Sequence, residues 1–126
     1  MVARLLRAED YSVEQAGTIN QGLKALETNP TLLVLCDVKL PDGNGVEATK
    51  TIKERFPATE IILFTAFGAI HDGVQAIKNG AFDYLVKGDD NNKILPLVAR
   101  AIEKAKLQFK IKALEAKITD SMTFDQ

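Results

Sequence analysis

The fold is decided by residues 32–45, which read Leu-Leu-Val-Leu-Cys-Asp-Val-Lys-Leu-Pro-Asp-Gly-Asn-Gly. An apolar run leads directly into Asp37, and proline and glycine turn chemistry follows at once. An apolar run of this length, bounded by turn residues, is typical of a strand buried on both faces of a parallel sheet. Ligands of open α/β sheets bind beyond the carboxyl ends of the strands. The pattern therefore places Asp37 where such a fold carries its chemistry.

Two further segments, 60–64 and 82–86, predict buried strands that end at Thr65 and Lys87. Helical spacing predicts helices at 2–9, 19–27, 45–56, 71–78 and from 92 to about 118. Residues 12–16 alternate polar and apolar side chains, which predicts a half-exposed edge strand. Strands that alternate with helices indicate a doubly wound parallel sheet with right-handed crossovers. Asp37, Thr65 and Lys87 are therefore expected at one edge of that sheet.

The composition is that of one globular domain. The chain has 126 residues, 46% of them hydrophobic and 26% charged, with a net charge of −1. This charge gives no indication of a nucleic-acid or membrane surface, and no apolar run is long enough to span a bilayer. A single cysteine, Cys36, excludes an internal disulfide and suits a reducing cytosol. We therefore expect a cytoplasmic protein.

A carboxylate, a hydroxyl and an ammonium around one point can handle a phosphoryl group. The carboxylate can act as the nucleophile and form an acyl phosphate. The ammonium can neutralise charge on the phosphoryl oxygens, and the hydroxyl can donate a hydrogen bond to one of them. Mg²⁺ normally bridges the carboxylate and the phosphate, because two anions in contact repel each other.

With these residues in place, the chain resembles the receiver domain of bacterial two-component response regulators, over about residues 1–104. Several spaced motifs carry the resemblance: the apolar strand into Asp37, Leu-Pro-Asp-Gly-Asn-Gly at 40–45, Phe-Thr-Ala at 64–66, Asn-Gly-Ala-Phe-Asp-Tyr-Leu at 79–85 and Val-Lys at 86–87. The fold that this implies is flavodoxin-like, with strand order 2-1-3-4-5.

The resemblance assigns a role to five residues. It implies that Asp37 accepts phosphate from a sensor histidine kinase. It implies that Thr65 moves toward the phosphate and that Lys87 pairs with it. Tyr84 matches the aromatic switch position, whose ring rotates with phosphorylation. Lys39 would offer its backbone carbonyl, beside Asp37, to Mg²⁺.

The sequence departs from the family at two places. The first strand of the family, with the acidic pair that binds Mg²⁺, is absent, so we expect an N-terminally truncated sheet and an incomplete metal site. Three outcomes are open: residues 12–16 pair directly with 32–36, a second chain fills the gap by strand exchange, or residues precede Met1 in the natural protein. The second departure is Gly88, where the family usually has proline after the lysine.

The C-terminal helix is longer than a receiver requires. Leu107, Ile111, Leu114 and Ile118 follow 4-3-4 spacing, which favours a two-stranded coiled coil and a homodimer. The ending 122–126 resembles the entry to the ATPase domain of sigma-54-dependent, nitrogen-regulation-type activators. We therefore predict a receiver at 1–104, a linker helix at 105–118, and at 119–126 the start of an output domain that is not present.

The leading hypothesis is a phosphorelay receiver, not an enzyme, that controls transcription through a downstream output domain. The alternative is a receiver-like dimerisation module without phosphotransfer. A flavodoxin-like flavin protein is the third hypothesis, but the chain offers it no phosphate-binding loop. We expect Cys36 to be a buried apolar side chain and His71 a surface residue without a role. We also expect this chain itself to bind neither nucleic acid nor a membrane.

Overall fold

Three parallel strands form the sheet at the centre of the protein. The computed structural model describes residues 2–66, 69–88 and 91–125. The strands β1 (Leu33–Asp37), β4 (Glu60–Thr65) and β5 (Asp83–Val86) lie in the order β1-β4-β5. The central strand β4 is almost entirely buried, because helices cover both of its faces and leave little place for polar side chains. All three predicted buried strands are therefore confirmed as strands of one sheet.

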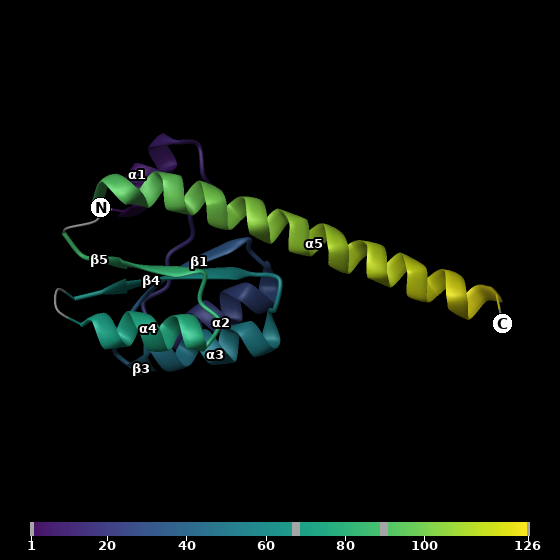
Figure 1. The fold of residues 1–126 in the computed structure, drawn as a ribbon, viewed down its shortest axis with the longest axis horizontal. Coiled ribbons are helices and arrows are strands. Elements are labelled where there is room, and N and C mark those ends of the chain that lie inside the picture. The colour runs from purple at the N-terminus through teal and green to yellow at the C-terminus, as the bar shows by residue number, and fades with distance from the viewer. Residues whose placement is uncertain (1, 67–68, 89–90, 126) are drawn as a thin grey trace.

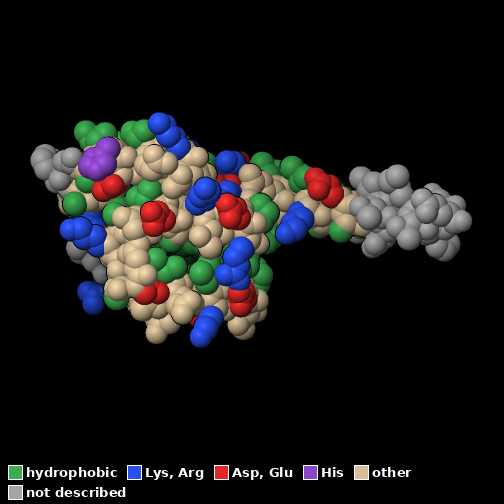
Figure 2. All heavy atoms as spheres, turned by 90° about the horizontal axis from the view of Figure 1, so that it is seen from below, with side chains coloured by type: hydrophobic (Ala, Val, Ile, Leu, Met, Phe, Trp, Pro, Cys, Tyr) green, Lys and Arg blue, Asp and Glu red, His purple; other side chains and the backbone are tan. Residues whose placement is uncertain are grey.

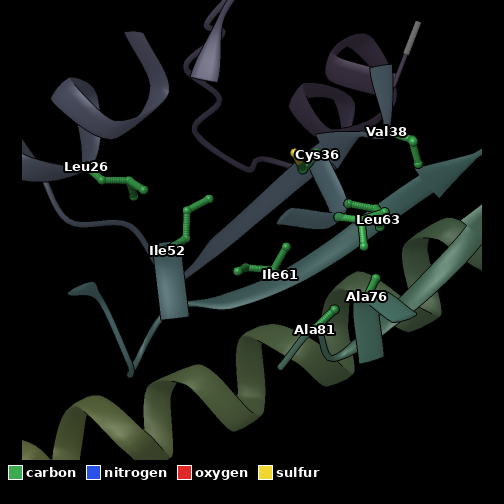
Figure 3. Packing of buried hydrophobic residues seen from close by; sticks show 9 residues of the cluster. Leu26, Cys36, Val38, Ile52, Ile61, Leu63, Ala76 and Ala81 are labelled. Carbon is green, nitrogen blue, oxygen red and sulfur yellow. The ribbon is translucent and has the colours of Figure 1, made fainter. Parts of the chain in front are cut away.

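The helices cover the two faces of the sheet (Figure 1). One face carries α1 (Val2–Ala8) and α5 (Ile94–Asp125), and the other carries α2 (Ile19–Thr28), α3 (Gly45–Arg55) and α4 (Ile70–Lys78). Each face has its own apolar cluster. The α2–α4 side contains Leu26, Cys36, Val38, Val46, Ile52, Ile61, Leu63, Ala76 and Ala81, most of them labelled in Figure 3. The α1–α5 side contains Leu6, Ile62, Leu85, Ile94, Leu97, Val98 and Ala101.

The predicted edge strand at residues 12–16 is wrong. The chain crosses there from the α1 face to α2 without regular secondary structure. Val13 packs with Tyr11 against the α1–α5 cluster, which explains its apolar character. Alternation alone makes no strand, because a strand needs a neighbour for its backbone groups. Within the described residues, β1 pairs with β4 alone, so direct pairing of 12–16 with β1 is also excluded.

The last helix begins and ends later than the sequence predicts. A short 3₁₀ turn (Asn91–Lys93) precedes α5, which continues unbroken to Asp125. Pro96 is the third residue of α5, where its missing N–H has no intrahelical partner to lose. The first part of α5 packs on the sheet, and the remainder extends away from it as a stem (Figure 1). No described helix is long and apolar enough to cross a membrane.

A buried carboxylate connects the two helical layers at the amino end of the sheet. The side chain of Glu60, the first residue of β4, is 1% exposed. Its Oε2 lies 3.6 Å from Nζ of Lys53 in α3 and 3.6 Å from Nζ of Lys104 in α5. Neither oxygen of Glu60 has a hydrogen-bond partner. A buried charge of this kind depends on its cations, so Glu60 helps to fix where the stem leaves the domain.

Candidate functional site

The strand register brings the three predicted site residues to one edge of the sheet. Asp37 is opposite Phe64 in the β1–β4 ladder, so Thr65 lies one residue farther along β4. Thr65 is opposite Val86 in the β4–β5 ladder, and Lys87 follows directly. The backbone N–H of Lys87 donates to the carbonyl of Thr65 at 2.9 Å. The parallel topology thus places Asp37, Thr65 and Lys87 together at the carboxyl ends of their strands, as the sequence predicts.

Asp37 and Lys87 form a direct ion pair. Nζ of Lys87 is 2.5 Å from Oδ1 of Asp37, and the two side chains are 52% and 42% exposed. This exposure leaves the carboxylate accessible from solvent, while the ammonium holds one of its oxygens. An incoming phosphoryl group would therefore find a nucleophile and a cation side by side.

The hydroxyl of Thr65 is bonded to strand β5 and not to Asp37 or Lys87. The residue is 1% exposed, and its hydroxyl donates to the carbonyl of Leu85 at 3.4 Å. That distance exceeds the usual range of about 2.5–3.0 Å for a hydroxyl donor. The hydroxyl is thus engaged with β5 by a weak bond, and the rotation of one side chain would free it.

The loop after Asp37 is a compact structure rather than an open turn. The two-residue strands β2 (Lys39–Leu40) and β3 (Gly43–Asn44) form an antiparallel ladder. The chain then returns to the site, and the N–H of Gly45 donates to the carbonyl of Val38 at 2.7 Å. A Cβ at position 45 would lie 2.0 Å from the carbonyl oxygen of Asp37. Only glycine permits this approach, a requirement that the sequence pattern does not reveal.

Asp42 fixes the same loop to a helix far away in the sequence. Its two carboxylate oxygens accept hydrogen bonds from the backbone N–H groups of Ile19 and Asn20, at 2.8 and 3.0 Å. The side chain therefore caps the start of α2, together with Thr18, whose hydroxyl accepts from Gln21 N–H. The bonds from Ile19 and Asn20 lower the pKa of Asp42 below its usual range. The acidic side chain of the turn is thus a structural cap.

Tyr84, the predicted switch residue, lies on β5 and packs against the buried Gly73 of α4. A Cβ at position 73 would be 2.5 Å from Cγ of the tyrosine ring. The tyrosine is half-buried, so its ring is in contact with α4 rather than fully in solvent. The ring thus connects the strand that precedes Lys87 with the surface of α4.

The described residues do not form a complete magnesium site. Asp37 supplies one carboxylate, which is already paired with Lys87, and Lys39, the residue expected to offer its backbone carbonyl, lies in β2. No group of three or more His, Cys, Asp or Glu side chains gathers anywhere in the described ranges. Mg²⁺ prefers near-octahedral oxygen ligation and commonly uses one or two carboxylates with substrate phosphate and water. Within the described part of the site, the carboxylate of Asp37 would therefore have to share its oxygens between Lys87 and the ion.

The remaining candidates lie outside this arrangement. The side chain of His71 is 85% exposed at the start of α4, beside Asp72. Cys36 is buried, and its burial, with the charge of Asp37, raises its pKa to about 11. Figure 2 shows acidic and basic side chains intermixed on the face formed by α2–α4, without a surface of one sign. His71 is thus exposed and Cys36 is buried, as the sequence predicts for these two residues.

Comparison with known proteins identifies the family. The sequence profile of the "Response regulator receiver domain" matches residues 1–99. The chain belongs to the response regulator receiver family. An NtrX-like response regulator of Rickettsia bellii is 33% identical over 122 residues, which are 95% of this chain and 26% of the relative. The chain thus spans about a quarter of that relative's length.

Solved receiver structures have the same fold. The receiver domain of NtrX from Brucella abortus matches with a TM-score of 0.77 and 26% identity, over 81% of this chain and 87% of that one. The beryllofluoride-activated NtrC4 receiver domain, solved as a dimer in solution, matches with a TM-score of 0.75 and 30% identity, over 81% and 84% of the two chains. The parallel sheet with helices on both faces is therefore the receiver fold.

Proposed function

We propose that this receiver domain accepts a phosphoryl group on Asp37 from a sensor histidine kinase. The observation that carries the proposal is the Asp37–Lys87 ion pair at the open carboxyl edge of the sheet. A structural carboxylate would more often be a cap, as Asp42 is. Asp37 instead faces solvent beside a lysine and a threonine, the set of groups that phosphoryl transfer requires.

The transfer is a displacement at phosphorus. A carboxylate oxygen of Asp37 forms a new O–P bond while the P–N bond of the phosphohistidine breaks. The imidazole nitrogen keeps the electron pair of the broken bond and takes up a proton from solvent. Lys87 then shifts from the carboxylate to a phosphoryl oxygen, which it neutralises. Thr65 exchanges its long bond to Leu85 for a stronger one to the phosphoryl group. Through Lys87 and Thr65, β4 and β5 respond to the modification.

Receivers as a family use Mg²⁺, and Asp37 with the carbonyl of Lys39 is where this chain would present oxygen ligands. In the described residues these donors fall short of a complete site, and Asp37, Lys87 and Thr65 carry the transfer.

The family relationship supports a proposal for the wider role of the chain. We place the receiver at residues 1–104, a linker helix at 105–118 and the start of an output domain at 119–126. The output domain is of the sigma-54-dependent activator class and regulates transcription. The domain works in the cytoplasm as a phosphorylated regulator rather than an enzyme, and it forms a homodimer through α5.

The proposal is tested by phosphorylation with a small donor. The full chain is incubated with acetyl phosphate in a Mg²⁺ buffer, and its intact mass is measured. We expect one phosphoryl adduct, which Asp37→Asn abolishes and Asp42→Asn, the matched control in the same loop, retains. The absence of an adduct on the folded wild-type chain would overturn the proposal.

A second candidate is a receiver-like dimerisation module without phosphotransfer. The incomplete set of metal ligands around Asp37 favours it. The same experiment separates the two: no adduct together with a stable dimer supports this second function.

A further inference from the structure

One lysine of α5 lies beside the amino ends of two strands of the sheet. Nζ of Lys104 is 3.6 Å from Oε2 of Glu60, the first residue of β4. The same atom is 5.6 Å from the centre of the ring of Phe82, which directly precedes β5. The first contact is an attraction between opposite charges, and the second is a cation–π interaction. A single charged side chain of α5 therefore contacts the starts of both strands.

The carboxylate of Glu60 attracts this lysine without fixing it by a hydrogen bond. Glu60 is buried, and neither of its oxygens has a hydrogen-bond partner in the described residues. Nζ of Lys53 and Nζ of Lys104 both lie 3.6 Å from Oε2, which is beyond the range of about 2.7–2.9 Å for a charge-assisted hydrogen bond. Because a buried charge depends on its ion pairs, Glu60 favours positions of α5 that keep Lys104 near.

The two lysines differ in how firmly they are held. Nζ of Lys53 donates hydrogen bonds to the carbonyls of Pro57 and Thr59, at 2.9 and 3.1 Å. Lys53 is thus fixed to the end of α3 and to the loop before β4. The side chain of Lys104 is instead 51% exposed. Of the two cations around Glu60, Lys104 is therefore the one with room to move, together with α5.

The stem beyond Lys104 lies over an incompletely filled space. Gln108 follows one helical turn later, and its buried Oε1 has no hydrogen-bond partner in the described residues. Farther along, the stem lines a pocket of about 120 Å³ at the amino edge of the domain. Phe109 and Lys112 form one side of this pocket, and Pro30, Arg55 and Phe56 lie among the residues of the domain that line it. A change in the tilt of the stem therefore disturbs little close packing here.

We propose that Lys104, held by Glu60 and Phe82, sets the direction in which the stem leaves the domain. The two strands that it contacts carry the site at their opposite ends, since Thr65 ends β4 and Lys87 follows β5. A shift of either strand at the phosphoryl site would move the partners of Lys104 and, with them, the stem. This coupling rests on the proposed function, whereas the contacts that hold the stem do not.

The direction of the stem can be measured with two spin labels in the full chain. Lys24→Cys in α2 and Ala116→Cys in the stem place the labels at exposed positions. Position 116 lies about 18 Å beyond Lys104 along the helix, so a tilt of about 20° would move it by about 6 Å. An excess of unlabelled wild-type chain ensures that double electron–electron resonance measures distances within one molecule. Wild-type chain treated with the label shows whether Cys36 reacts.

Removal of the charge on Lys104 should release the stem. Lys104→Met keeps the aliphatic part of the side chain, and we expect the mean distance to shift, or its distribution to widen, by about 5 Å. Glu60→Gln should have the same effect, because it removes the other charge. Lys106→Met, which changes an exposed lysine of the same helix, is the matched control and should leave the distances unchanged. Circular dichroism establishes that each variant is folded.

An unchanged distance distribution in folded Lys104→Met would overturn the proposal. This variant keeps the proposal testable if Glu60→Gln does not fold, because Lys104 is half exposed and Glu60 is buried.

The coupling to the site is tested by repeating the measurement after incubation with acetyl phosphate and Mg²⁺, with the adduct verified by intact mass. We expect the adduct to change the mean distance in the wild type and not in Lys104→Met. An adduct that leaves the wild-type distances unchanged would overturn the coupling. The absence of an adduct would instead overturn the proposed function and the coupling with it, while Lys104→Met alone decides what sets the direction of the stem.

Discussion

Replacing Gly73 by alanine is predicted to force the Tyr84 ring against α4 or out of its position. A Cβ at position 73 would lie 2.5 Å from Cγ and Cδ2 of the ring and 2.6 Å from Cδ1. Overpacking of this kind costs about 1–3 kcal/mol. Alanine also regains about 1 kcal/mol of helix propensity. The net expected loss of unfolding free energy is therefore between about 0 and 2 kcal/mol.

In a protein that already carries Tyr84→Ala, the effect of Gly73→Ala on the unfolding free energy should have the opposite sign. Without the ring, the methyl group at position 73 meets no clash with it, and Gly73→Ala should stabilise the protein by about 1 kcal/mol. The wild type, the two single variants and the double variant form a double-mutant cycle, whose coupling energy is then about 1–3 kcal/mol. Gly22→Ala in α2 is the matched control, because its Cβ would meet only Ala16, at 3.9 Å, and it should stabilise both backgrounds equally.

The assay is equilibrium urea denaturation of the four proteins of the cycle, followed by circular dichroism. A coupling energy below about 0.5 kcal/mol would refute the reasoning, since independent sites add within that error. Such a result would mean that the ring does not rest on Gly73 and that α4 does not sense its position.

Three further predictions concern the residues around the site. Gly45→Ala places a methyl group 2.0 Å from the Asp37 carbonyl oxygen, and it should cost about 3 kcal/mol or more in urea denaturation; a cost below about 1 kcal/mol would contradict the predicted clash. The Asp42 carboxylate has its pKa lowered from 3.8 by the N–H of Ile19, so its contribution to stability is complete above pH 3.8 and is lost as the pH falls through the lowered pKa. Between about pH 5 and pH 2, the unfolding free energy of the wild type should therefore fall by more than that of Asp42→Asn. Equal losses in the two proteins would show that protonation of Asp42 does not cause the loss of stability. The raised pKa of Cys36, about 11 instead of 9.0, predicts alkylation by iodoacetamide about 100-fold slower in the folded chain than in urea, and equal rates would show that the thiol is exposed.

The sheet and the site core were predictable from the sequence for one physical reason. Strands buried on both faces must be continuous apolar runs, and their carboxyl ends must meet at one edge. Once the strands that end at 37, 65 and 86 are recognised, the positions of Asp37, Thr65 and Lys87 follow from topology without any knowledge of side-chain packing. The hydrogen bond by which Thr18 caps α2 is local as well, and bonds of this kind have sequence signatures.

The features that the sequence did not reveal depend on contacts between distant segments. Asp42 caps a helix that begins 23 residues earlier, and no local pattern marks that relation. The requirement for glycine at positions 45 and 73 arises from a carbonyl and a ring that only the folded chain brings near. At residues 12–16 the sequence predicts a strand that the structure lacks. The alternating pattern indicates one apolar side, but it does not supply a neighbouring strand.

Because α5 is unbroken, a change in its tilt at the edge of the domain displaces the whole of its far end. Ala105 is the last fully buried side chain among the described residues of α5, and the helix continues to Asp125. At 1.5 Å per residue, this arm is about 30 Å long. A tilt of about 10° where Lys104 meets Glu60 would move the far end by about 5 Å. The packed part of α5, from Ile94 to Ala105, is about 16 Å long, so a displacement at the start of the helix is about doubled at its far end.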